Sequence, residues 1–295
     1  MDCLTNCHFT GVTRNFQEAE MYAITGVTGH VGSAAARALR AANHPIRTIV
    51  RDPLKGDVVA DFADTPALTK AFEDCDGAFV LLPTVPPFTE AVHRELSASI
   101  AAAVRASGLP HVVLLSAWGA DLSEGTGPVR WLHHLENLLR DTGATVTAIR
   151  APHFQEKVET VLDAAIGAGV YPVFGDSADV AVPMVATRDI GEVVANALVN
   201  PPAASEIVVL EAPSYTERQV AEALGEQLGK ALHVVTIPRA DWLGALTAAA
   251  VPGQLAEELV ALYAADADGR LQPRGDRRVR CATDITATLR DVTGR

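Results

Sequence analysis

The sequence predicts a doubly wound α/β fold, in which helices cover both faces of a parallel sheet, followed by a smaller C-terminal α+β portion. A glycine-rich segment stands between a short apolar run and an Ala-rich helical run near the start of the chain. Apolar runs then alternate with helical patterns up to residue 150, which is typical of βαβ units with right-handed crossovers. The pattern then loosens, so we expect residues 21–150 to form a nucleotide-binding domain and residues 151–295 a substrate-binding portion.

The first 20 residues differ in composition from the rest of the chain, because they are polar and show no regular periodicity. We expect them to be an irregular N-terminal extension. The four cysteines are too scattered for a disulfide framework or a zinc site, so we expect free thiols in a reducing compartment and no bound metal. They are Cys3, Cys7, Cys75 and Cys281.

The glycine-rich segment predicts a site for a nucleotide phosphate. It follows an apolar strand at residues 21–24 and precedes a helix at residues 33–42. In such a turn the first glycine allows a tight bend, the second lets the backbone approach a pyrophosphate, and the third allows close packing of helix on strand. The anion then binds the unpaired N–H groups at the helix N-terminus. The expected phosphate-binding residues are Gly26, Thr28, Gly29, His30, Val31 and Gly32.

The remaining elements follow in order from hydrophobic periodicity and turn residues. The predicted strands of the first part are residues 45–50, 77–82, 111–116 and 144–149, and its helices are residues 66–73, 88–107 and 129–141. In the C-terminal portion the predicted helices are residues 158–168, 189–199, 216–228 and 241–249, and the short strands are residues 207–210 and 233–236.

The residue after the second strand indicates which dinucleotide would bind. An NAD site usually has an acidic residue there for the ribose 2′-OH. Here the position is held by Arg51, 19 residues after Gly32, with Lys55 close behind. A guanidinium suits a 2′-phosphate, so the pattern predicts NADP, with NAD as the second choice. Asp52 could serve as the acid if the register shifts by one residue.

Ligands in this fold bind at the carboxyl ends of the strands, so the residues that follow each strand complete the site. We expect the cofactor site to include Asp61, Phe62, Leu82, Pro83, Ser116 and Ala117 as well as Arg51 and Lys55. We expect the substrate pocket to include Trp118, His133, His153, Phe154 and Gln155.

Several of these motifs, taken together from Met21 to about Leu243, resemble the NmrA-like branch of the atypical short-chain dehydrogenases/reductases. They are Thr25-Gly26-x-x-Gly29-x-x-Gly32, Val50-Arg51-Asp52-Pro53, residues 77–83, Leu114-Leu115-Ser116, residues 147–150 with Phe154, and residues 183–190. The resemblance implies a Rossmann fold and NADP as cofactor. That branch includes NADPH-dependent quinone, azo-dye and triphenylmethane reductases, and redox-sensing regulators that bind NADP without turning it over.

The chain departs from that family at its catalytic pair. Short-chain dehydrogenases generally use Tyr-x-x-x-Lys, in which the lysine lowers the pKa of the tyrosine that gives a proton to the substrate. No tyrosine lies between Tyr22 and Tyr171, and the helix predicted at residues 129–141 has no lysine. Leu132 occupies the position where relatives often carry Lys or His, and Ala117 stands where they often have Ser.

Histidine can donate a proton near neutral pH, so we expect His153, His134 and Ser116 to take the catalytic roles. Helical periodicity places His133 on the solvent face with Glu136 and Asn137, and His134 beside the buried leucine stripe. That stripe consists of Leu132, Leu135 and Leu139.

These observations predict an NADPH-dependent reductase of a small aromatic, quinone-like or secondary-metabolite substrate. A non-catalytic NADP-binding redox-sensing regulator and a non-redox isomerase or cyclase remain as alternatives. A formal net charge of −12 and a pI near 5.2 argue against nucleic acid as a partner. No apolar run reaches the roughly 18 residues that cross a bilayer, so we expect a cytoplasmic monomer or homodimer.

Overall fold

The computed structural model describes residues 20–294, so Cys3 and Cys7 and most of the predicted N-terminal extension lie outside the described residues. Within this range an eight-stranded sheet has the order β13-β10-β6-β5-β4-β1-β2-β3, and all of its strand pairs are parallel. The strands are β1 (Tyr22–Thr25), β2 (Ile46–Val50), β3 (Val58–Val59), β4 (Gly77–Val80), β5 (His111–Ala117), β6 (Thr145–Ala151), β10 (Glu206–Glu211) and β13 (Arg277–Arg280). The doubly wound α/β prediction is confirmed.

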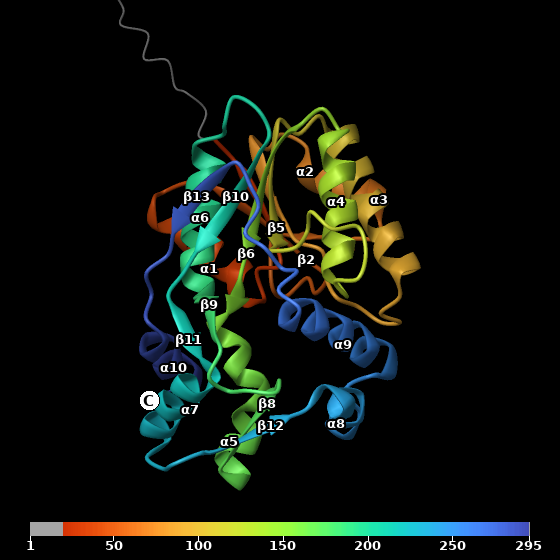
Figure 1. Cartoon of the computed structure of the whole chain (residues 1–295). Helices are drawn as coiled ribbons and strands as arrows, with labels where there is room; N and C mark the ends of the chain where they lie inside the picture. The colour runs from red at the N-terminus through yellow and green to blue at the C-terminus, as the bar shows by residue number, and fades with distance from the viewer. Residues whose placement is uncertain (1–19, 295) are drawn as a thin grey trace, which may run out of the picture.

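Helices cover both faces of the sheet (Figure 1). One face packs against α1 (His30–Ala41) and α6 (Thr187–Val199) through a core that includes Ile24, Val113 and Ile190. The other face packs against three helices through a second buried cluster. These helices are α2 (Thr65–Phe72), α3 (Glu90–Ser107) and α4 (Val129–Arg140).

Local sequence signals fix several helix ends. Thr89 caps α3 by accepting a hydrogen bond from the Val92 backbone N–H, and Gly108 ends this helix in the left-handed conformation with φ +68°. Thr216 and Gln219 form a reciprocal capping box at the start of α7 (Glu217–Leu228). These caps satisfy backbone groups that a helix end leaves unpaired.

The C-terminal part of the chain adds strands to the main sheet and also builds a region of its own. β10 and β13 extend the main sheet beyond β6. The third buried cluster lies wholly between Val158 and Leu289. The division of the chain at residues 150 and 151 stays a prediction. The additional strands are β7 (His153–Phe154), β8 (Val170–Phe174), β9 (Ala181–Val185), β11 (Ser214–Thr216) and β12 (His233–Ile237).

The helical segments of this C-terminal region gather at one end of the main sheet (Figure 1). They are η1 (Gln155–Val161), α5 (Leu162–Ala168), α7, η2 (Arg239–Asp241), α8 (Trp242–Ala248), α9 (Gly253–Ala267) and α10 (Ile285–Thr293). The single helix predicted at residues 158–168 is therefore wrong in its first half, where the chain forms a 3₁₀ segment. The described residues contain no helix with the length and apolarity that crossing a membrane requires.

The elements that the sequence prediction missed include α9, β13 and α10. The strand β13 reads as polar because it holds three arginines on the sheet edge. Arg277 pairs with Glu206, and Arg278 pairs with Glu211 on the neighbouring strand. Cross-strand ion pairs on an exposed edge leave no apolar alternation for a sequence pattern to detect.

Candidate active site

The glycine loop is a backbone cradle with no room for side chains at two of its three glycines. Gly26 has φ +65°, and a Cβ there would lie 2.4 Å from Leu81 Cδ2. A Cβ on Gly32 would lie 2.3 Å from the Gly26 carbonyl oxygen. Gly29 is the N-cap of α1, and no described side chain caps this helix. The first N–H groups of α1 are therefore open to an anion, as the sequence predicts.

The loop after β2 separates the two candidate residues for the ribose. Arg51 is exposed, and its side chain makes no hydrogen bond or ion pair within residues 20–294. Asp52 instead serves its own loop, because Oδ1 accepts from the Leu54 N–H at 3.0 Å and Oδ2 lies 3.7 Å from Lys55 Nζ. This arrangement leaves the guanidinium, not the carboxylate, free to meet a ligand.

The other predicted cofactor residues lie at or just beyond strand ends. Asp61 is exposed and accepts a hydrogen bond from the Ala63 N–H at 2.9 Å. Phe62 and Leu82 pack against the core on the side of α2 and α3. Pro83 is partly buried in the segment after β4, and Ala117 is the last residue of β5. Their contacts with a cofactor stay predictions.

Ser116 belongs to a buried polar network. Its hydroxyl donates to Glu136 Oε1 at 2.6 Å. Arg150 donates two hydrogen bonds to the same carboxylate, from Nε to Oε1 at 2.9 Å and from a terminal nitrogen to Oε2 at 2.7 Å. The side chains of Arg150 and Glu136 are 4% and 2% exposed. This bidentate pair ties α4 to β6, and the Ser116 hydroxyl proton points to Glu136.

The expectation that Glu136 faces solvent is wrong. The buried residues of α4 include Trp131, Leu135, Glu136 and Leu139, whereas Leu132 is only partly buried. The inward face is therefore rotated relative to the leucine stripe. A carboxylate can lie in this face because Arg150 on the neighbouring strand satisfies both of its oxygens.

The two histidines of α4 face different neighbours. His134 Nδ1 lies 3.4 Å from an Arg94 guanidinium nitrogen on α3. Burial, together with the Arg94 charge, lowers the pKa of His134. His133 has Nδ1 2.9 Å from the Ala120 carbonyl and Nε2 3.0 Å from the Asn137 amide nitrogen. Their predicted roles in catalysis and in the substrate pocket stay predictions.

His153 lies just beyond the carboxyl end of β6. Its Nε2 is 3.1 Å from Asp266 Oδ2 on α9. The Trp118 backbone N–H donates to the Ala151 carbonyl at 3.0 Å, so the chain after β5 runs beside the chain that leads to His153. The indole Nε1 of Trp118 is buried and has no hydrogen-bond partner among the described residues. Trp118 and His153 thus belong to neighbouring strand ends, as predicted.

Phe154 and Gln155, the other predicted pocket residues, differ in their surroundings. Phe154 is partly buried against the core beneath α1 and α6. Gln155 is buried, and its amide nitrogen donates to the Met184 and Thr283 carbonyls. Thr288 donates to the Gln155 amide oxygen at 2.5 Å. All polar atoms of Gln155 therefore serve internal packing.

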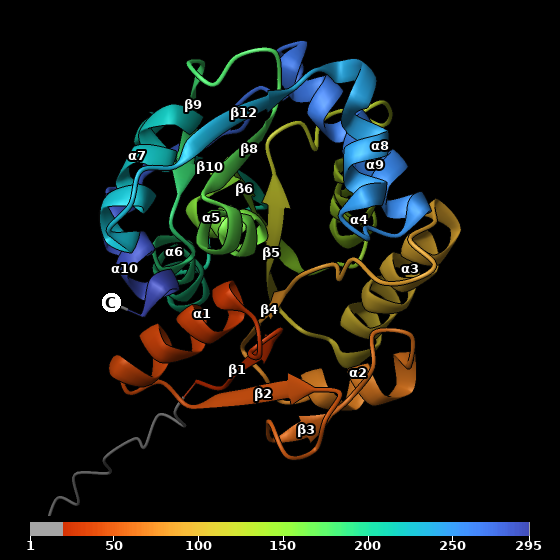
Figure 2. The ribbon, with the colours of Figure 1, turned by 90° about the horizontal axis from the view of Figure 1, so that it is seen from below.

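Helix α9 packs beside α4 and contacts His153 at the carboxyl end of the sheet. The sequence analysis did not predict this helix. Arg130 at the start of α4 binds both carboxylate oxygens of Glu258. Gly127 lies so close to α9 that a Cβ would be 2.2 Å from the Glu258 carbonyl oxygen. Figure 2 shows α8 and α9 side by side near α4. No local motif marks these contacts, because each joins residues more than a hundred positions apart.

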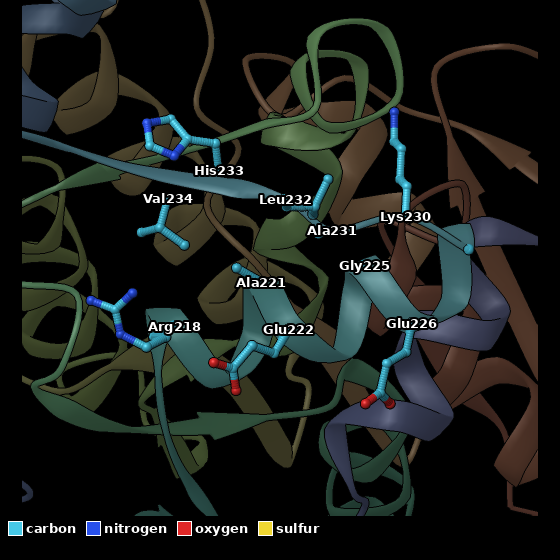
Figure 3. A pocket seen from close by; sticks show the side chains of 11 residues that line it. Arg218, Ala221, Glu222, Gly225, Glu226, Lys230, Ala231, Leu232, His233 and Val234 are labelled. Carbon is cyan, nitrogen blue, oxygen red and sulfur yellow. The ribbon is translucent and has the colours of Figure 1, made fainter.

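A described cavity lies elsewhere in the C-terminal region. It has a volume of about 680 Å³ and lies between α7 and β12 (Figure 3). Its walls carry Arg218, Glu222, Glu226 and Lys230. Arg218 is paired with Asp179, and Lys230 donates to a backbone carbonyl. None of the predicted site residues lines this cavity.

The parallel doubly wound sheet and the open glycine loop at the start of α1 define a Rossmann-type nucleotide-binding fold. The chain belongs to the NmrA-like family, whose model matches residues 19–273.

The relatives include enzymes named for redox reactions. An NAD(P)H azoreductase from Xenophilus azovorans is 25% identical over 255 residues, which cover 83% of this chain and 86% of the relative. Quinone oxidoreductase 2 from Escherichia coli (strain K12) is 26% identical over 251 residues, which cover 81% and 85%. A structure of Citrobacter sp. triphenylmethane reductase complexed with NADP(H) aligns with a TM-score of 0.72 at 21% identity, and the match covers 93% of this chain and 95% of that chain.

Proposed function

We propose that this protein is an NADPH-dependent reductase of a small planar substrate, such as a quinone or another conjugated aromatic compound. The observation that carries the proposal is the unpartnered Arg51 at the end of β2, next along the sheet from β1 and its open glycine loop. The relatives named as NAD(P)H azoreductase and quinone oxidoreductase support an oxidoreductase. The NADP prediction agrees with the cofactors named for the relatives.

The described residues fit such a cofactor. The open N-terminus of α1 and the tight glycine turn before it suit a pyrophosphate, and the Arg51 guanidinium suits a 2′-phosphate. NADPH, when bound, supplies a hydride. Trp118 and Phe154 would form aromatic walls for a planar acceptor. The buried indole N–H of Trp118 is a donor that a substrate oxygen could satisfy.

Charge reversal at Arg51 tests the cofactor. Arg51→Glu should weaken NADPH binding by about 30-fold, because a hydrogen bond to a charged group contributes about 2 kcal/mol. NADH affinity should change by less than about threefold, since NADH lacks the 2′-phosphate. Titration of nucleotide fluorescence measures both. Lys70→Glu, at an exposed position of α2, is the control. Equal losses for NADPH and NADH would overturn the assignment.

A second measurement tests turnover. The native chain should oxidise NADPH in the presence of 2-methyl-1,4-naphthoquinone, seen as loss of the nicotinamide absorbance. Tight NADPH binding without oxidation by quinones or azo dyes would overturn the reductase and favour the NADP-binding regulator.

A further inference from the structure

The pair formed by His153 and Asp266 brings a histidine and a carboxylate together at the carboxyl end of the sheet. His153 lies on β7, and Asp266 lies in the last turn of α9. Their side chains are 31% and 33% exposed and meet at 3.1 Å. They are neither enclosed in the core nor free on the surface. A partly exposed histidine with one ring nitrogen against a carboxylate can use its other ring nitrogen to exchange a proton with a ligand.

Asp266 has the surroundings of a carboxylate that stays ionised. Burial raises its pKa, but the hydrogen bond from His153 and the positive charges of His153 and Lys157 outweigh this effect and lower it. Lys157 also donates to Glu217, which accepts a second hydrogen bond from the Tyr171 hydroxyl at 2.8 Å. Lys157, whose charge acts on Asp266, is thus itself paired with Glu217.

The ring geometry of His153 fixes the chemistry. Nε2 faces Asp266, so it carries a hydrogen in both the neutral and the protonated ring. Nδ1 has no partner among the residues that the structure describes. A protonated ring can therefore release the proton on Nδ1 while Nε2 keeps its hydrogen and its contact with Asp266.

The same chain segment reaches the glycine loop. Six residues after His153, Glu159 Oε2 in η1 lies 3.0 Å from His30 Nε2, and His30 is the first residue of α1. On the other side, the backbone hydrogen bond between Trp118 and Ala151 ties the end of β5 to the approach to His153. His153 therefore lies on a segment that joins the predicted phosphate site to the predicted aromatic wall.

We propose that His153 donates the proton that completes reduction of the substrate, and that Asp266 is the positioning residue that orients and stabilises the protonated ring. The inference rests on the proposed reductase function. Hydride transfer brings two electrons to the substrate and leaves a negative charge on its oxygen. The Nδ1–H bond of His153 then breaks as an O–H bond forms on that oxygen. Solvent returns a proton to the neutral ring, so no further reagent is required.

Two variants with matched controls test this proposal. His153→Gln should lower kcat with 2-methyl-1,4-naphthoquinone by about 100-fold, the lower range for a general acid, with KM for NADPH within about twofold. The kcat should also lose its decline toward alkaline pH. Asp266→Asn should lower kcat by about tenfold and move that decline to lower pH. His233→Gln on β12 and Asp268→Asn beyond α9 make the same chemical changes at exposed positions.

A measurement without cofactor tests the pair itself. In His153→Gln the Asp266 carboxyl should titrate at higher pH than in the native chain, because burial then acts without its partner. Carboxyl carbon NMR shifts of the cofactor-free protein follow this titration, and His233→Gln should leave it unchanged.

Each outcome decides between the two proposals. If the native chain reduces the quinone and His153→Gln has the same kcat, His153 is not the proton donor, but the reductase function stands. An unchanged Asp266 titration in His153→Gln would also overturn the pair. If the native chain oxidises no NADPH with any acceptor, the reductase fails and this inference fails with it.

Discussion

The glycine loop and helix α9 belong to the same end of the molecule but are held in place by different forces. In the loop, the backbone of the turn after β1 approaches α1 so closely that a Cβ on Gly32 would lie 2.3 Å from the Gly26 carbonyl oxygen. Helix α9 is tied to the chain around it by side-chain charges, through Arg130 with Glu258 and His153 with Asp266. The loop depends on glycines that carry no Cβ, whereas the position of α9 depends on charged side chains.

This difference explains how each region can act. A cradle of backbone N–H groups binds a phosphate whatever the pH, because amides do not titrate. A helix held by carboxylates and a histidine responds to pH and can present a group that exchanges a proton. In the reduction that we propose, the loop would bind the cofactor and the pair of His153 and Asp266 would deliver the proton.

The largest expected effect comes from adding one methyl group to the loop. Gly32→Ala should lower the free energy of unfolding by about 3 kcal/mol, since the backbone of Gly26 must move. Gly244→Ala in α8 is the control, because nothing lies within 4 Å of its Cβ and alanine favours a helix. It should stabilise the protein by about 0.5 kcal/mol. Urea denaturation measures both, and equal responses would show that α1 does not need the glycine.

Short-range signals account for what the sequence predicted. Gly26, Gly29 and Gly32 act on their own neighbours, and Arg51 follows directly from the end of β2, so both are visible in a local pattern. By contrast, Glu136 is buried because Arg150 arrives from another strand. Helical periodicity places Glu136 on the solvent face, because periodicity within one helix does not show which residues of other elements will pair with its side chains.

Asp266 shows the same limit at the candidate site. Nothing in the residues around it distinguishes it from Asp268, which pairs with Arg239 on the surface. Its pairing with His153 appears only when α9 folds back over a separation of 113 residues. The position of His153 after β6 was predictable, whereas the group that orients it was not.

A smaller effect is expected when α9 loses its tie to α4. Arg130→Met removes the hydrogen bonds to Glu258, Glu90 and the Gly127 carbonyl. It should lower the free energy of unfolding by about 2 kcal/mol, because Glu258 is left with its side chain only 17% exposed. Arg218→Met removes an exposed pair with Asp179 and should change the free energy of unfolding far less. Equal losses in urea would contradict a special role for Arg130.

The smallest expected effect is a pH dependence that separates the two regions. The pKa of Asp266 is lower in the folded chain than its ordinary value of 3.8, so the carboxylate stabilises the fold above about pH 4. This contribution is lost as the pH falls through the lower folded-state pKa. The native chain should therefore exceed Asp266→Asn in free energy of unfolding at pH 6, and the gap should narrow at pH 3. A gap that stays constant would mean that Asp266 is not ionised against His153.

Gly32→Ala removes no titrating group, so its loss in free energy of unfolding should be the same at both pH values. A loss that changes with pH would contradict the backbone account of the loop.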